Sequence, residues 1–131
     1  MSEFRILVAE DNVINQQVVT RMLEKLAYEA DFVSDGESAV DAAREGKYDI
    51  ILMDVMMPKM GGMEASKIIR SEETDKHRAL IIALTANAMD SDRFRCMEAG
   101  MDDYISKPFV LDTLRAKLEK ACNTLAGGAS A

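Results

Sequence analysis

Five side chains suited to acid, metal or phosphoryl chemistry follow short apolar runs of this sequence. They are Glu10, Asp11, Asp54, Thr85 and Lys107. Carboxylates that share a cleft repel one another, and a divalent cation removes the cost of ionising all of them. Oxygen ligands suit Mg²⁺, or Mn²⁺ in its place, and Mg²⁺ favours phosphate oxygens as further ligands. A lysine and a threonine can bind oxygens of a transferred phosphoryl group, and an aspartate can accept that group. The residue types therefore predict a site that receives a phosphoryl group on an aspartate.

The apolar runs themselves predict strands that are buried on both faces, because their apolar residues are continuous rather than alternating. They cover residues 6–9, 49–53 and 79–84, with a weaker run at 104–105 and a possible edge strand at 29–33. Helical spacing of apolar residues separates the runs, so the predicted order is βαβαβαβαβα. This alternation is typical of an α/β layer fold.

Local signals indicate where the five predicted helices begin and end. Asn12 is a candidate N-cap for the first helix, and Gly46 is expected to end the second. Phe94 and Met97 mark the fourth helix, which Gly100 closes. The third helix follows the pair Gly61-Gly62, and the fifth carries an apolar stripe formed by Leu111, Leu114, Leu118 and Cys122.

The predicted sheet would bring the five side chains to one edge. Ligand sites of open parallel sheets lie beyond the carboxyl ends of the strands, where the strand order reverses. In a sheet of order 2-1-3-4-5, the first and third strands are neighbours, and Asp11 and Asp54 would face one another. The nearby pair Asp102-Asp103 follows Gly100, and we expect it to be a solvated loop instead.

Composition excludes several classes of protein. The chain of 131 residues has 23 acidic and 16 basic side chains, a formal net charge of −7. Such a surface disfavours binding to nucleic acid or an anionic membrane through bulk charge. Cys96 and Cys122 are too far apart for a CxxC motif, and no run approaches the roughly 20 apolar residues of a membrane span. We therefore expect one cytoplasmic domain with reduced thiols.

The complete set of motifs resembles the receiver domain of two-component response regulators over about residues 5–122. The matching segments are Glu10-Asp11 after ILVA, Asp54 within IILMDVMMP, Thr85 within ALTA, and Lys107-Pro108-Phe109 after AGMDDYIS. The segments VAEDNVINQ and IALTANAM are most similar to receivers of hybrid sensor histidine kinases. The resemblance implies a flavodoxin-like (βα)5 three-layer sandwich, with a five-stranded parallel sheet of order 2-1-3-4-5. Residues 1–125 would form the receiver domain and residues 126–131 a flexible tail.

The resemblance also implies a role for each site residue. Asp54 matches the phosphoacceptor, and Glu10, Asp11, Asp54 and the backbone carbonyl of Met56 match the Mg²⁺ ligands. Thr85 and Lys107 match the phosphate-binding pair, and Thr85 and Tyr104 match the switch residues, although Tyr104 could equally be a packing residue. The expected partner is a histidine kinase domain or a histidine phosphotransfer domain, with no contact to nucleic acid or membrane. Such a signalling domain assists its own phosphorylation and dephosphorylation rather than turning over a free substrate.

Three alternatives compete with this interpretation. A pseudo-receiver would use the same fold as a protein-binding module without phosphorylation, but it should lack one of Asp11, Asp54 or Lys107. A phosphatase of the haloacid dehalogenase type needs an acid two residues after its nucleophile, where this chain has Met56. A flavin carrier needs a phosphate-binding loop rich in Ser, Thr and Gly after residues 6–9, which the sequence lacks. Many receivers have Asp-Gly in place of Gly61-Gly62, a departure expected to alter local backbone freedom rather than activity.

Overall fold

A central parallel sheet of five strands organises the chain. The computed structural model describes residues 4–57, 59–73, 78–85, 90–106 and 110–125. The strands are β1 (Ile6–Ala9), β2 (Ala30–Val33), β3 (Ile50–Asp54), β4 (Leu80–Thr85) and β5 (Asp103–Ser106). The helices are α1 (Val13–Lys25), α2 (Gly36–Arg44), α3 (Gly62–Glu72), α4 (Asp90–Glu98) and α5 (Leu111–Leu125). The sheet order is β2-β1-β3-β4-β5 and every pairing is parallel, which confirms the predicted fold.

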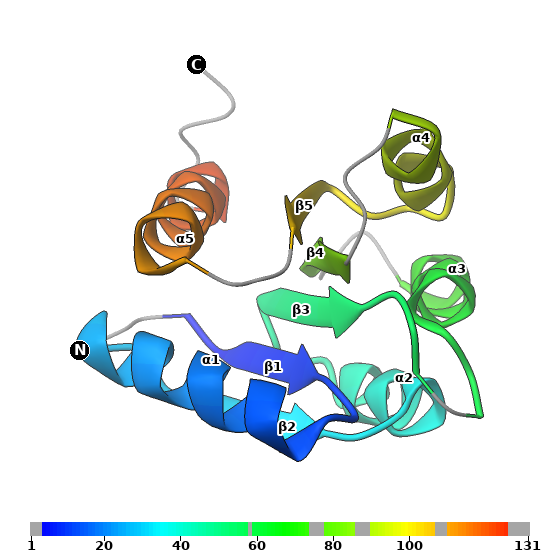
Figure 1. Cartoon of the computed structure of the whole chain (residues 1–131). Helices are drawn as coiled ribbons and strands as arrows, with labels where there is room; N and C mark the ends of the chain where they lie inside the picture. The colour runs from blue at the N-terminus through cyan, green and yellow to red at the C-terminus, as the bar shows by residue number, and fades with distance from the viewer. Residues whose placement is uncertain (1–3, 58, 74–77, 86–89, 107–109, 126–131) are drawn as a thin grey trace.

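The sheet lies between two layers of helices (Figure 1). Helices α1 and α5 cover one face, and α2, α3 and α4 cover the other. Side chains alternate along each strand, so Ile6 and Val8 of β1 pack toward α1 and α5, whereas Leu7 and Ala9 pack toward the other layer. The continuous apolar runs of the sequence thus reflect burial on both faces.

The structure confirms the predicted N-cap of α1, the glycine after α2 and the buried stripe of α5. The Asn12 side chain caps α1 by accepting a hydrogen bond from the Asn15 amide at 3.0 Å. Gly46 follows α2 with a φ of +70°, a conformation that suits glycine at a helix end. Leu114 and Leu118 of α5 are buried, as its apolar stripe predicts. Among the described residues, no helix has the length and apolar character needed to cross a membrane.

Helix α4 turns a different side to the sheet than the sequence predicts. Phe94 is 64% exposed and Met97 is 52% exposed, whereas Cys96 and Ala99 are buried. Phe94 and Met97 mark this helix in the sequence, and apolar residues at helical spacing usually face the core. In this short and otherwise polar helix, the smaller side chains instead allow close packing against the sheet.

The prediction that Asp102-Asp103 is a solvated loop is wrong. The Asp102 carboxylate accepts hydrogen bonds from the Arg70 guanidinium at 2.6 Å, the Arg78 guanidinium at 2.9 Å and the Ile81 amide at 2.9 Å. The Asp102 carboxylate therefore has a structural role, because charged and backbone donors from other elements converge on it. Asp103 is the first residue of β5 and so belongs to a strand rather than to a loop.

Candidate functional site

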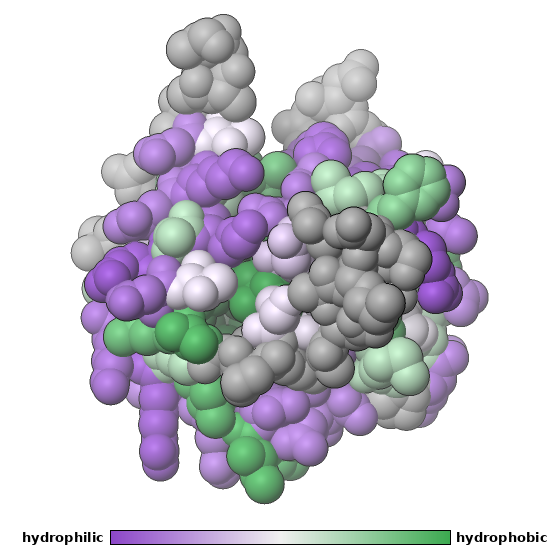
Figure 2. Space-filling model, turned by 45° about the horizontal axis from the view of Figure 1, so that its top comes forward, coloured by the Kyte–Doolittle hydropathy of each residue, from purple (hydrophilic) through white to green (hydrophobic). Residues whose placement is uncertain are grey.

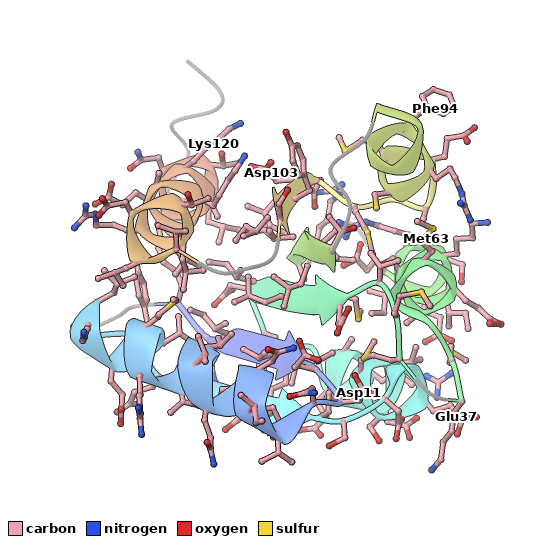
Figure 3. The ribbon with its side chains drawn as sticks, in the orientation of Figure 1. Asp11, Glu37, Met63, Phe94, Asp103 and Lys120 are labelled. Atoms are coloured by element: carbon pink, nitrogen blue, oxygen red, sulfur yellow. The ribbon has the colours of Figure 1, made fainter. Side chains whose placement is uncertain are left out.

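Three carboxylates meet at the carboxyl ends of β1 and β3. Glu10 and Asp11 directly follow β1, and Asp54 ends β3, whose residue Met53 pairs with Ala9 of β1. One carboxylate oxygen of each acid lies within 4.8 Å of those of the other two. Glu10 and Asp54 are 0% and 3% exposed, whereas Asp11 is exposed at the end of β1 (Figure 3). Crowded, partly buried carboxylates with oxygen-only donors fit a divalent cation such as Mg²⁺.

Backbone and side-chain hydrogen bonds position Glu10. Its amide donates to the Val33 carbonyl at 3.0 Å, which continues the pairing of β1 with β2 beyond the strand. Its carboxylate accepts a hydrogen bond from the Asn12 amide at 3.2 Å, and its carbonyl accepts one from the Gln16 side-chain amide. Gln16 is not among the predicted site residues, although its place in the first turns of a helix after the acidic pair was a usable signal.

The loop after β3 is tied to the same edge of the sheet. The Met56 amide donates to Asp54 Oδ1 at 3.1 Å, and the Val55 amide donates to the Leu84 carbonyl at 3.0 Å. The Met56 side chain is 76% exposed. The apolar side chain therefore points to solvent, while its backbone lies against the carboxylate of Asp54.

A close approach of helix α3 explains one of the two consecutive glycines. A Cβ built on Gly62 would lie 2.2 Å from the carbonyl oxygen of Asp54. Gly61 has a φ of −73°, which any residue can adopt, and a Cβ there would lie 3.1 Å from the Val55 carbonyl oxygen. Gly62, rather than Gly61, is thus required for the backbone of Asp54 to pass this close to α3.

The far end of the same loop rests on helix α2. The Gly36 amide donates to the Met60 carbonyl at 3.1 Å, and Lys59 Nζ lies 3.8 Å from an Asp35 carboxylate oxygen. Asp35 caps α2, and the hydrogen bond from the Ser38 amide at 2.7 Å is the main cause that lowers the Asp35 pKa. An ionised Asp35 is therefore favoured, and the loop that carries Met56 is held at both ends.

Thr85 and Tyr104 lie on the neighbouring strands. Thr85 ends β4 and is buried with 7% of its surface exposed, at the same edge of the sheet as Asp54. Tyr104 of β5 is half-buried and pairs with Ala83 of β4. The predicted site residue Lys107 lies outside the described residues, as does the predicted tail of residues 126–131. The structure thus gathers Glu10, Asp11, Asp54 and Thr85 at one edge, as the sequence predicts.

Comparison with known proteins agrees with this geometry. Residues 6–119 match the response regulator receiver domain family. The chain is 40% identical over 130 residues to histidine protein kinase 1 of Candida albicans, covering 92% of this chain and 5% of that protein. It is 48% identical over 113 residues to the hybrid signal transduction protein dokA of Dictyostelium discoideum, covering 86% and 7%. The chain therefore spans less than a tenth of the length of these two relatives.

Two solved structures superpose closely on this fold. One is the receiver domain of a sensor histidine kinase from Pseudomonas aeruginosa PAO1, with a magnesium ion coordinated in its active site cleft. It superposes with a TM-score of 0.82 at 44% sequence identity, and the match covers 91% of this chain and 97% of that one. The other is the Saccharomyces cerevisiae receiver domain of the response regulator Ssk1 in complex with the histidine phosphotransfer signaling protein Ypd1. It superposes with a TM-score of 0.84 at 31% sequence identity, and the match covers 92% of this chain and 90% of that one. With the five-stranded fold and the acidic edge, these matches establish that the chain belongs to the response regulator receiver domains of two-component phosphorelays.

Proposed function

We propose that Asp54 accepts a phosphoryl group from a phosphohistidine and that the phosphorylated chain relays a two-component signal. The observation that carries the proposal is the convergence of Glu10, Asp11 and Asp54, with two of the three carboxylates buried. Carboxylates crowded this closely repel one another, and a bound divalent cation with oxygen ligands would relieve that repulsion.

Glu10, Asp11, Asp54 and the backbone carbonyl of Met56 would hold the divalent cation, Mg²⁺ or Mn²⁺. Bound there, the cation neutralises the carboxylates and the oxygens of the incoming phosphoryl group. The magnesium ion in the cleft of the related receiver from Pseudomonas aeruginosa supports this assignment.

In the transfer itself, a carboxylate oxygen of Asp54 forms a bond to phosphorus while the bond from phosphorus to the imidazole nitrogen breaks. The imidazole leaves with the electron pair of that bond, and the product is an acyl phosphate on Asp54. The Met56 amide, which donates to Asp54 Oδ1, orients the acceptor carboxylate. The Thr85 hydroxyl and the Lys107 ammonium bind oxygens of the phosphoryl group on Asp54. Thr85 moves toward that group, and the Tyr104 ring moves into the space that Thr85 leaves.

The surface around the acidic site favours a protein donor. Four of the exposed large apolar side chains follow the carboxyl ends of β1, β3 and β5, either in the connecting segments or in the first turn of α1. They are Val13, Ile14, Met56 and Val110, which are 63%, 69%, 76% and 54% exposed. On the face shown in Figure 2, hydrophobic side chains interrupt a largely hydrophilic surface. A histidine kinase domain or a histidine phosphotransfer domain, the kind of partner seen with the yeast receiver, would cover these side chains when it presents its histidine.

Phosphorylation by acetyl phosphate in the presence of Mg²⁺ tests the proposal. The wild-type chain should gain the mass of one phosphoryl group, and hydroxylamine should remove it, because it is an acyl phosphate. Asp54→Asn should remain unlabelled, and chelation of the metal should abolish labelling of the wild type. Asp41→Asn, an exposed substitution on α2, is the matched control and should label normally. Equal labelling of Asp54→Asn would refute the proposal, and a wild-type chain that neither binds Mg²⁺ nor labels would be a pseudo-receiver.

A further inference from the structure

Lys117 of helix α5 reaches around the open edge of the sheet to contact two consecutive residues of β5. Its ammonium lies 2.7 Å from Asp103 Oδ1 and 5.0 Å from the centre of the Tyr104 ring. Consecutive strand residues point to opposite faces, and Tyr104 packs with the cluster under α2, α3 and α4. Since β5 is an edge strand and α5 covers the other face, Lys117 links the two faces across that edge.

The Asp103 carboxylate fixes the position of this ammonium. The side chains of Lys117 and Asp103 are 26% and 16% exposed, so their ion pair is partly shielded from water. Lys120, one turn further along α5, is 3.9 Å from Asp103 and 74% exposed (Figure 3). Lys117 is therefore the close partner of Asp103, and a cation held in place loses little further entropy when it stacks on the Tyr104 ring.

The register of the sheet places Tyr104 close to Thr85. Tyr104 pairs with Ala83, whose small side chain lies on the same face of β4 as Thr85 two residues later. Thr85 pairs with Ser106 and Asp103 pairs with Ile82, so a ring that moves toward Thr85 moves away from the residue that holds the Lys117 ammonium. We expect that movement to weaken the cation–π contact. The contact therefore favours the ring orientation seen in this structure.

We propose that Lys117, held by Asp103, is a positioning residue that restrains Tyr104 and thereby weakens the response of the acidic site to a phosphoryl group. The inference rests on the proposed function, in which Tyr104 follows Thr85. Cation–π contacts at partly exposed sites correspond to a change of about two- to fivefold in such an equilibrium.

Titration of the full chain with beryllofluoride and Mg²⁺, an unreactive substitute for the phosphoryl group, measures this restraint. Lys117→Met should bind beryllofluoride about two- to fivefold more tightly than wild type. Lys117→Arg keeps a cation over the ring and should bind like wild type, and so should the control Lys120→Met. In a Tyr104→Leu chain, adding Lys117→Met should have no further effect. The Tyr104 ring signals in NMR spectra of the unliganded chain should shift with Lys117→Met and not with Lys120→Met.

The outcomes separate failure of the restraint from failure of the proposed function. If wild type binds beryllofluoride but Lys117→Met binds it equally or more weakly, the restraint is refuted while the phosphoryl site stands. The same gain in the Tyr104→Leu chain would show that Lys117 acts through Asp103 alone, which also refutes it. If the Tyr104 ring signals in NMR spectra do not shift in Lys117→Met, the restraint is refuted without any ligand being added. If no chain binds beryllofluoride, the proposed function fails and the inference fails with it.

Discussion

Replacement of Gly62 by alanine tests whether the close approach of α3 sets the position of Asp54, the proposed acceptor. The new Cβ would lie 2.2 Å from the Asp54 carbonyl oxygen and 2.9 Å from the Asp54 carbonyl carbon. The first distance is 0.8 Å inside the 3.0 Å that such a contact needs at least. Both atoms belong to the backbone, so no side chain can rotate away. Either α3 or the end of β3 must therefore shift by about that amount.

Two effects of this substitution oppose each other, and their magnitudes decide the sign. Alanine in a helix is more favourable than glycine by about 1 kcal/mol. Forced overpacking in a well-packed region costs about 1–3 kcal/mol, and here the clash involves rigid backbone. We therefore expect Gly62→Ala to lower the free energy of unfolding by up to about 2 kcal/mol, and the melting temperature by up to roughly 8 °C for a domain of this size.

The adjacent glycine is the matched control, and phosphorylation supplies a second measurement. A Cβ on Gly61 would lie 3.1 Å from the Val55 carbonyl oxygen, so Gly61→Ala should change stability by less than about 1 kcal/mol. Because displacements approaching 1 Å in a reactive group can cost up to about 100-fold in rate, labelling of Gly62→Ala by acetyl phosphate should slow by about tenfold or more. A Gly62→Ala chain as stable as wild type, and labelled at the same rate, would refute the reasoning.

Two further predictions concern groups away from the acceptor site. Arg70→Met should lower the free energy of unfolding in urea by about 2–3 kcal/mol, because it breaks a partly buried network. Arg44→Met breaks an exposed ion pair and should have a much smaller effect, so equal losses in the two variants would contradict this reasoning. Burial, and then the hydrogen bond to Asp31 at 2.6 Å, raises the Tyr48 pKa to about 12. A raised pKa means that the folded chain keeps this proton more tightly than the unfolded chain, whose tyrosine pKa is about 10. The associated stability is complete below about pH 10 and declines as the pH rises toward about 12. Urea unfolding at a series of alkaline pH values should therefore show a smaller decline for Tyr48→Phe than for wild type, and parallel curves would contradict the assignment.

The sequence was sufficient to predict the sheet and the acidic edge because both depend on chain order and residue type. Continuous apolar runs can be stable only where both faces of a strand are covered, and parallel strands carry their terminal residues to one edge. With the strand order 2-1-3-4-5 that the resemblance to receiver domains implies, these two rules place Asp54 beside Glu10 and Asp11 without any knowledge of side-chain conformation.

Features that depend on packing could not be predicted in the same way. The orientation of α4 is set by how closely Cys96 fits against the sheet, and the exposed Phe94 gives the opposite signal. The role of Asp102 depends on Arg70, which lies 32 residues away, so no local spacing could indicate it. The close approach of Gly62 to Asp54 likewise appears only once helix and strand are placed together.

The stabilising network and the proposed functional site lie at opposite ends of the strands of the sheet. At the carboxyl ends of the strands, the crowded carboxylates of Glu10, Asp11 and Asp54 repel one another. At the amino ends, Arg70 donates at 2.7 Å to the carbonyls of Ala79, just before β4, and Gly100, while it pairs with Asp102 just before β5. Hydrogen bonds from a charged donor contribute more than neutral ones, so this network helps to offset the cost of the acidic site. Because the two sets of contacts do not share residues, the charge at Asp54 can change while the Arg70 network keeps the amino ends of the strands in register.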